Sequence, residues 1–189
     1  MGKKLFDFLG ALALLVLAAP LFPLIAAWIK ATSSGPVIFR QIRLGYHGMP
    51  FTMLKFRTLK DKTGRPMDRI LQGDSRVTAP GRFLRKTHLD ELPQLINVLL
   101  GEMSLVGPRP FELKLSEKCI QEIPLFARRL DVLPGITGLS QIYGRERHIK
   151  WGFRGVLRLD LFYIDRHCTL FDLYILFRTT ETVLRGKGI

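Results

Sequence analysis

The stretch THLDELPQLINVLLGEMSLVGPRP, residues 87–110, concentrates the signals that decide how this chain folds. Apolar residues recur in it at the spacing of one helical face: Leu92, Leu95, Ile96 and Leu99. Gly101 suits the position just after a helix C-terminus. Pro93 has to lie in the first turn, where its missing N–H costs little. The sequence therefore predicts a helix that begins near Asp90 and ends before Gly101.

The same stretch holds an acid pair and a rigid turn. Asp90 and Glu91 stand at the predicted helix start, where carboxylates are common simply as caps. They can also ligate Mg²⁺ beside a phosphate or attack phosphorus as a nucleophile. Neighbouring helical residues point about 100° apart, so the two acids are expected to have different tasks. Arg109, fixed between Pro108 and Pro110, suits a phosphate contact, although a surface turn arginine remains the alternative.

Charge and cysteine content narrow the classes of protein. The chain has 189 residues with 29 Lys and Arg against 16 Asp and Glu, a formal net charge of +13. Such an excess implies an acidic partner, which can be nucleic acid, anionic lipid or a phosphorylated substrate. Cys119 and Cys168 lie far apart without metal-ligand spacing and are expected to be reduced thiols. The sequence contains no Walker A loop, no GxGxxG and no GxSxG motif.

The N-terminal 30 residues predict a membrane element. Leu5 to Ile29 holds 25 residues and one charge, Asp7. A straight helix of that length reaches roughly 37 Å, against a hydrocarbon core of about 30 Å. Pro20 and Pro23 break the hydrogen-bond ladder, and the basic residues that follow favour a cytoplasmic domain. A spanning helix and a bent re-entrant one both fit. A cleaved signal peptide is not expected, because the downstream chain lacks a secreted character.

Other segments carry weaker patterns. Val37–Arg43 and Phe51–Thr58 alternate and predict a β-hairpin with Lys55 and Arg57 on one face, which can simply be solvated. Lys60–Gln72 reads as a loop and Arg82–Lys86 as a short basic helix. Phe111–Leu130 is expected to be helical with an interruption at Pro124.

The C-terminal third is expected to hold a glycine-rich loop and a helical region. Leu133–Arg145 predicts a loop that brings backbone N–H groups to a ligand. Arg158–Arg185 is expected to be helical, with a break near His167 to Thr169. An apolar stripe there fits either the membrane surface or core packing: Leu170, Leu173, Tyr174 and Phe177.

Taken in order, these segments resemble the small monotopic phosphoglycosyl transferases of the bacterial sugar transferase family over nearly the whole chain. The resemblance rests on the following motifs: KKLFDF (3–8), VIFRQIRLG (37–45), MLKFRTL (53–59), RVTAPGRFLRKTHLDELPQLINVLLGEMSLVGPRP (76–110), PGITGLSQIYGR (134–145) and LDLFYIDRHCTLFDLYIL (159–176). It implies an α/β fold, mostly helical with a small β-hairpin. Residues 1–32 would form a re-entrant helix–break–helix, and residues 33–189 a compact catalytic domain with amphipathic interfacial helices. The location implied is the cytoplasmic face of the bacterial inner membrane.

The resemblance also implies the chemistry. The family transfers a phosphosugar from a UDP-sugar to polyprenyl (undecaprenyl) phosphate and releases UMP through a covalent Asp intermediate, as the initiating step of lipid-linked glycan assembly. Asp90 would be the nucleophile and a ligand of Mg²⁺, with Glu91 as its partner. Six further residues would bind substrate or phosphate: Arg109, Lys55, Arg57, Arg85, Asp160 and Asp172. For the two aspartates, helix solvation or a structural ion pair is the alternative.

The expected partners are UDP-sugar, polyprenyl phosphate and anionic lipid headgroups, without nucleic acid, and a homodimer is possible. Some positions depart from the family pattern. Ala19 replaces the serine expected before Pro20, and the glycine-rich loop differs at Leu133, Leu139 and Tyr143. The rival hypothesis is a non-catalytic, membrane-anchored basic module that binds nucleic acid or anionic lipid. It explains the net charge but neither the acid pair nor the Pro-Arg-Pro turn.

Overall fold

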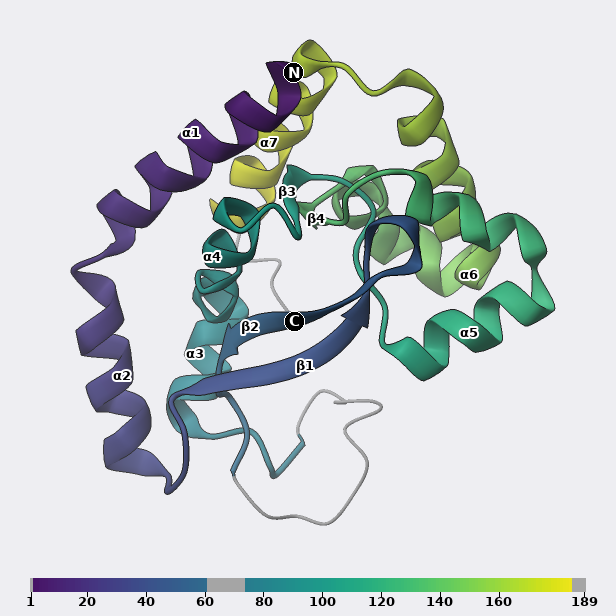
Figure 1. Cartoon of the computed structure of the whole chain (residues 1–189). Coiled ribbons are helices and arrows are strands. Elements are labelled where there is room, and N and C mark those ends of the chain that lie inside the picture. The colour runs from purple at the N-terminus through teal and green to yellow at the C-terminus, as the bar shows by residue number, and fades with distance from the viewer. Residues whose placement is uncertain (1, 61–73, 185–189) are drawn as a thin grey trace.

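The computed structural model describes residues 2–60 and 74–184, and it describes side chains for all of these except 144–151 and 183–184. The described chain is mostly helical with two small sheets (Figure 1). The α-helices are α1 (Gly2–Ala18), α2 (Leu21–Thr32), α3 (Ala79–Thr87), α4 (Gln94–Leu99), α5 (Leu113–Glu122), α6 (Leu139–Arg166) and α7 (Thr169–Leu184). The strands are β1 (Ile38–Leu44), β2 (Pro50–Phe56), β3 (Ser104–Val106) and β4 (Gly135–Thr137). Three 3-10 turns are η1 (Tyr46–Gly48), η2 (Leu89–Glu91) and η3 (Pro124–Asp131).

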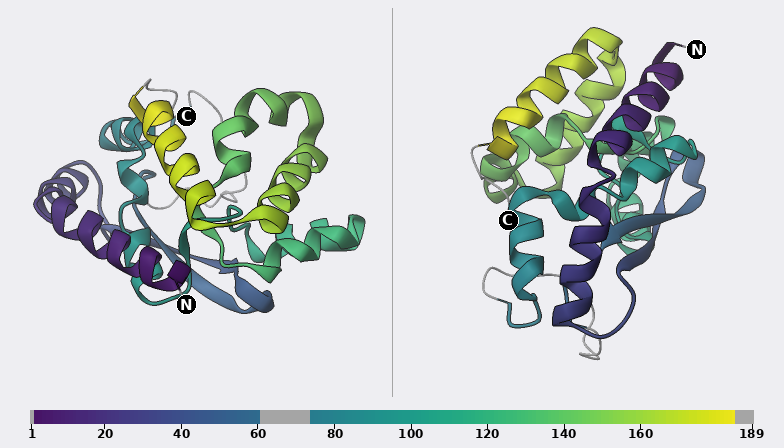
Figure 2. Two further views of the ribbon diagram at one scale, coloured as in Figure 1. Left: turned by 90° about the horizontal axis from the view of Figure 1, so that it is seen from above. Right: turned by 90° about the vertical axis from the view of Figure 1, so that its left-hand side faces the viewer.

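Helices α1 and α2 form a bent pair along one side of the molecule, where α1 packs on α4 and α2 on α3 (Figures 1 and 2). The two axes differ by 61° across a break at Ala19–Pro20. Pro23 lies in the first turn of α2 and adds no second break, because the N–H it lacks would have no helical partner there. Among the described residues no single helix is long and apolar enough to cross a membrane, whereas this pair taken together would be.

The predicted hairpin is confirmed. β1 and β2 pair antiparallel from Ile38 opposite Phe56 to Leu44 opposite Pro50. Asn97 of α4 ties the hairpin to the core: its Oδ1 accepts from the Leu54 N–H at 3.1 Å, and its Nδ2 donates to the Thr52 carbonyl at 2.8 Å. The helix that carries Asn97 therefore sets the position of β2.

The prediction that Leu133–Arg145 is a loop is wrong. Gly135–Thr137 forms β4, which pairs parallel with β3, and α6 already begins at Leu139. The glycines serve close packing between two backbones. A Cβ on Gly135 would lie 2.0 Å from the Gly107 nitrogen, and a Cβ on Gly138 would lie 2.2 Å from the Gly107 carbonyl oxygen. Gly135 and Gly138 are therefore required where two chain segments cross closely.

The helices of the C-terminal half test several further predictions. The helical region starts at Leu139 rather than near Arg158 and kinks at Gly152, where φ is +54°. The predicted break is confirmed between Arg166 and Thr169, and the predicted interruption at Pro124 separates α5 from η3. The apolar stripe of α7 faces outward: Leu170 is 78% exposed and Phe177 is 70% exposed. Ordinary core packing therefore does not explain that stripe.

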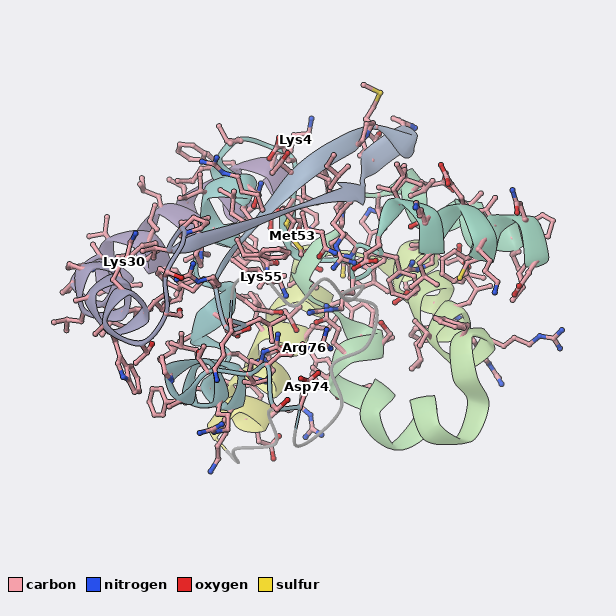
Figure 3. The ribbon with its side chains drawn as sticks, turned by 90° about the horizontal axis from the view of Figure 1, so that it is seen from below. Lys4, Lys30, Met53, Lys55, Asp74 and Arg76 are labelled. Atoms are coloured by element: carbon pink, nitrogen blue, oxygen red, sulfur yellow. The ribbon has the colours of Figure 1, made fainter. Side chains whose placement is uncertain are left out.

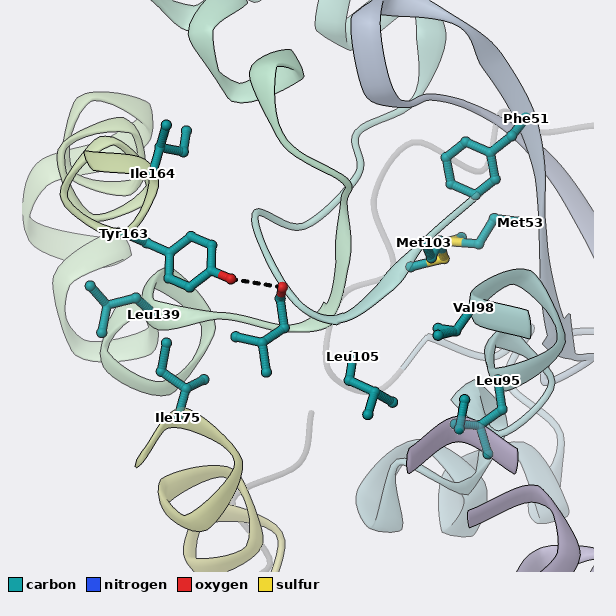
Figure 4. Packing of buried hydrophobic residues seen from close by; sticks show 12 residues of the cluster. Phe51, Met53, Leu95, Val98, Met103, Leu105, Leu139, Tyr163, Ile164 and Ile175 are labelled. Carbon is teal, nitrogen blue, oxygen red and sulfur yellow. Dashed lines mark hydrogen bonds between the residues drawn. The ribbon is translucent and has the colours of Figure 1, made fainter. Parts of the chain in front are cut away.

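The main core lies between α1, α4, the β3–β4 pair and the two C-terminal helices (Figure 4). Strand β3 crosses its centre. The Tyr163 hydroxyl donates to the Val106 carbonyl at 2.9 Å, the dashed line in Figure 4. Asp7 of α1 accepts from the Leu105 N–H at 3.2 Å. The strand that leads into the Pro-Arg-Pro turn is thus held by side chains from both ends of the chain.

Candidate active site

The acid pair lies in a 3-10 turn rather than at the start of an α-helix. Asp90 and Glu91 belong to η2, and α4 begins only at Gln94 after Pro93. His88 opens the turn with φ +58°, a left-handed conformation that reverses the chain after α3. Neither η2 nor α4 has a side-chain cap hydrogen bond. Capping, the ordinary explanation for acids at this position, does not account for the pair.

Glu91 is bound by two cations through one carboxylate oxygen. Its Oε1 accepts from Lys55 Nζ at 2.7 Å and from Arg109 Nη2 at 2.7 Å. Only 12% of the Glu91 side chain is exposed. Burial alone would raise the pKa of Glu91, but the charges of Arg109 and Lys55 outweigh it and hold that pKa well below its usual range. Glu91 is therefore an anion at neutral pH that joins strand β2 to the Pro-Arg-Pro turn.

Asp90 differs from Glu91 both in its pairing and in the direction of its pKa shift. It is 8% exposed, and within the part of the chain that the structure describes its carboxylate makes no hydrogen bond or ion pair. Burial, and then the neighbouring Glu91 charge, raise the pKa of Asp90 to about 6, against the opposing charges of Lys55, Arg85 and Arg109. An unpaired carboxylate surrounded by three cations is available to a reacting phosphorus or to a metal ion.

The predicted cations are placed unequally. Lys55 is on the inward-facing side of β2, and burial lowers the pKa of Lys55 while Glu91 opposes that effect. Figure 3 shows Lys55 on the same side of the molecule as Asp74 and Arg76. Arg85 of α3 donates through Nε to the Thr58 hydroxyl at 2.8 Å, and its charge acts on Asp90.

Arg57 is directed elsewhere than the other predicted cations. Its Nη2 donates to the Ser33 carbonyl at 2.9 Å and to the Ser33 hydroxyl at 3.0 Å, at the end of α2. Only 6% of Arg57 is exposed, so the solvated strand face considered from the sequence does not describe it. The structure therefore brings Lys55, Arg85 and Arg109 together at the acid pair and uses Arg57 to tie β2 to the N-terminal helices.

Arg109 has a partner that the sequence did not reveal. Its Nη1 donates to Gln141 Oε1 at 3.1 Å, so the guanidinium bridges Gln141 and Glu91. Gln141 lies in the first turn of α6, in the segment that was predicted to be a loop. Predicting a helix over residues 139–166 would have placed Gln141 in a first helical turn. The neighbouring glycines favoured a loop prediction for this segment.

Asp160 and Asp172 are buried, and both are used in ion pairs that lie apart from the acid pair. Asp160 Oδ2 pairs with Arg129 Nε at 2.7 Å. Asp172 Oδ2 pairs with Lys3 Nζ at 2.7 Å, and its Oδ1 lies 2.8 Å from the Tyr163 hydroxyl oxygen, whose single proton it shares with the Val106 carbonyl. These are the structural ion pairs that the sequence left open as the alternative to substrate binding.

The site's donors fit Mg²⁺ only together with a phosphorylated substrate. No group of three or more His, Cys, Asp or Glu side chains suited to a metal gathers within residues 2–60 and 74–184. Glu91 is already bound by Lys55 and Arg109, which leaves Asp90 as the free carboxylate. Mg²⁺ is commonly held by one or two carboxylates, waters and substrate phosphates, so a single carboxylate beside a pyrophosphate suffices.

The chain is similar to known sugar transferases over nearly its whole length. The family model for "Bacterial sugar transferase" matches residues 1–186. "Uncharacterized sugar transferase EpsL" of Bacillus subtilis is 41% identical over 99% of this chain and 89% of that protein. The UDP-glucose:undecaprenyl-phosphate glucose-1-phosphate transferase of Caulobacter vibrioides is 41% identical over 96% of this chain and 69% of that protein. The undecaprenyl-phosphate galactose phosphotransferase of Salmonella typhimurium is 38% identical over 98% of this chain and 41% of that protein.

The chain belongs to the bacterial sugar transferase family. The resemblance stated from the sequence is confirmed, and the chain is an enzyme of the phosphosugar transferase class. The rival hypothesis of a non-catalytic basic module is therefore wrong.

Proposed function

We propose that this protein transfers a phosphosugar from a UDP-sugar to undecaprenyl phosphate, with Asp90 as a covalent nucleophile. The observation that carries the proposal is the difference in pairing between the two carboxylates. Glu91 is neutralised by two cations, whereas Asp90 is buried, unpaired and faces the same cations. A carboxylate that needed only to bind a cation would be expected to pair with one, as Glu91 does.

In the first step a carboxylate oxygen of Asp90 attacks the β-phosphorus of the UDP-sugar. A bond forms between that oxygen and phosphorus, and the bond from phosphorus to the bridging oxygen breaks, so that UMP leaves with the electron pair. No proton transfer is needed. Arg109, Lys55 and Arg85 surround the reacting centre with positive charge, which stabilises the charge that develops on the phosphoryl oxygens.

In the second step a phosphate oxygen of undecaprenyl phosphate attacks the same phosphorus. The bond to Asp90 breaks and returns its carboxylate, and the product is the sugar diphosphate lipid. A covalent intermediate lets two substrates of different solubility use one site in turn. Asp90 and the substrate phosphates would hold Mg²⁺, which would supply positive charge that neutralises the phosphates.

The outer surface of the molecule supports a membrane-bound, re-entrant arrangement of α1 and α2. Large apolar side chains are exposed along both helices: Leu5, Phe8, Leu9, Leu12, Leu14, Val16, Leu17, Leu21, Leu24 and Trp28. A contiguous apolar surface of this kind marks contact with lipid or another protein. Lys3 pairs with Asp172 of α7, which joins the start of α1 to the helix with the exposed apolar stripe. We place the catalytic domain at the cytoplasmic face, because its basic residues favour that side.

The function is tested with purified protein in nanodiscs, Mg²⁺, undecaprenyl phosphate and a panel of UDP-hexoses and UDP-N-acetylhexosamines. We expect UMP release with at least one sugar. Absence of UMP with every sugar would contradict the proposed reaction.

The covalent step is tested without lipid acceptor, using a UDP-sugar labelled in its β-phosphate. We expect one equivalent of UMP and of protein-bound label per active site. Asp90→Asn should abolish both, whereas Asp165→Asn, an exposed carboxylate paired at the surface with Arg128, should retain them. Label retained by Asp90→Asn would overturn the assignment of the nucleophile.

A further inference from the structure

The ion pair between Arg129 and Asp160 is buried behind the Pro-Arg-Pro turn. Arg129 belongs to η3 and Asp160 to α6, and their side chains are 5% and 1% exposed. Burying two charges costs several kcal/mol, and an apolar pair of similar volume often stabilises a fold as well. Stability alone is therefore a weak explanation for this pair.

The guanidinium of Arg129 is fixed in position and orientation. Its carbon lies over the Phe111 ring at 4.3 Å from the ring centre and over the Phe126 ring at 4.6 Å. Nε is taken by Asp160, and Nη2 donates to the carbonyl oxygen of Arg109 at 2.7 Å. Arg129 thus connects a buried carboxylate to the backbone of the residue that enters the active site.

The backbone of the turn is held from a second direction as well. The Gly135 N–H donates to the Pro108 carbonyl at 3.0 Å, and the Gly107 N–H donates to the Thr137 carbonyl at 2.9 Å. The Arg109 side chain is 42% exposed and has many rotamers, yet it reaches Glu91 and Gln141 from this fixed base. The place of its backbone decides which atoms its guanidinium can reach.

We propose that Arg129 and Asp160 are positioning residues for Arg109 in phosphosugar transfer, an inference that rests on the proposed function. Asp160 orients Arg129, Arg129 holds the Arg109 carbonyl, and the Arg109 guanidinium is thereby aimed at Glu91 and the substrate phosphates. Neither member of the pair contacts substrate. Asp160, which the family resemblance suggested as a substrate ligand, acts instead through two intervening side chains.

The test uses Arg129→Lys, which keeps the charge but lacks the second nitrogen needed to bridge Asp160 and Arg109. We expect kcat/KM for the UDP-sugar to fall about 10- to 100-fold, because small displacements of a positioning group carry penalties of that size. Arg128→Lys is the matched control, since Arg128 is exposed and pairs at the surface with Asp165. It should keep wild-type kinetics.

A double-mutant cycle separates positioning from general destabilisation. If Arg129 acts through Arg109, adding Arg129→Lys to Arg109→Lys should lower kcat/KM less than twofold further. An equal loss in both backgrounds would overturn the proposal. If Arg129→Lys fails to fold, Asp160→Asn replaces it in the cycle, because asparagine has nearly the same shape as aspartate. The same two outcomes then support or contradict the proposal.

Affinity for inorganic pyrophosphate with Mg²⁺, measured by calorimetry, provides a readout without turnover. Arg129→Lys and Asp160→Asn should weaken that affinity, and Arg128→Lys should not. A wild-type protein that binds pyrophosphate but releases no UMP contradicts the proposed reaction and leaves this comparison valid. Unchanged pyrophosphate affinity in both variants would contradict the positioning role.

Discussion

Asp90 and Glu91 are adjacent in the chain, yet the fold gives their carboxylates opposite energetics. The pKa of Asp90 is raised to about 6, above the value of an unfolded aspartate near 3.9. The folded protein therefore binds a proton more tightly there than the unfolded chain does. Protonated Asp90 therefore adds to the free energy of unfolding below pH 4, and this contribution is lost as the pH rises through 6. The pKa of Glu91 is lowered, so its contribution is present at neutral pH and lost on acidification.

These opposite signs make a prediction for metal-free protein. At pH 7.5 in EDTA, Asp90→Asn should raise the free energy of unfolding by at most about 3 kcal/mol, the equivalent of roughly two pKa units. The gain should shrink toward pH 4.5. Glu91→Gln should lower stability at pH 7.5, because it leaves Lys55 and Arg109 without their anion. Thermal unfolding at the two pH values measures both, and a common sign for the two variants would contradict this account.

At the scale of elements, the site depends on how helix α4 is fastened to strand β2. Asn97 makes three bonds from the buried face of α4, to the Leu54 N–H, the Thr52 carbonyl and Glu102. The bonds to Leu54 and Thr52 fix strand β2, which carries Lys55, relative to the turn that carries Glu91. A displacement of β2 along α4 would separate this ion pair.

Two buried amides on α4 provide a matched comparison. Asn97 and Gln94 are each 1% exposed, but the Gln94 Nε2 has no hydrogen-bond partner within the described residues. Asn97→Leu should cost at least about 2 kcal/mol, because it leaves two backbone groups of β2 unsatisfied. Gln94→Leu should be neutral or stabilising. Chemical denaturation in detergent measures both, and equal destabilisation by the two substitutions would show that Asn97 has no special role in fastening the hairpin.

At the scale of the whole molecule, the bent α1–α2 pair decides how the enzyme meets the membrane. If the pair is re-entrant, both of its ends face the cytoplasm. Lys4 and Lys30, near those ends, are exposed and can be replaced without disturbing the core (Figure 3). Cys168 is exposed and has to be removed first, whereas Cys119 is buried.

We therefore predict the labelling of Lys4→Cys and Lys30→Cys in a Cys168→Ser background. A membrane-impermeant maleimide should modify both cysteines in inside-out vesicles and neither in intact spheroplasts. Arg128→Cys, on the exposed surface of the catalytic domain, reports the cytoplasmic side in the same samples. Modification of Lys4→Cys only from the periplasmic side would show a spanning arrangement.

The sequence alone determined the features that depend on neighbouring residues. The period of Leu92, Leu95 and Ile96 predicted a helix, Gly101 predicted its end, and Pro20 predicted the break in the N-terminal apolar segment. The same local signals singled out Asp90, Glu91 and Arg109, which the structure brings together. Backbone preference and side-chain periodicity act over a few residues, and a sequence displays them directly.

Only the tertiary structure decided which of the two acids is free. Glu91 is neutralised by residues 36 and 18 positions away in the chain, and those distances close only when β2 and the Pro-Arg-Pro turn pack against η2. The same is true of Asp160 and Asp172, whose partners Arg129 and Lys3 come from other elements. Gly135 and Gly138 approach the Gly107 backbone, which is distant in the chain, and the local sequence does not display that contact. Burial and long-range pairing set the chemistry of a charged group, and both are properties of the packed chain.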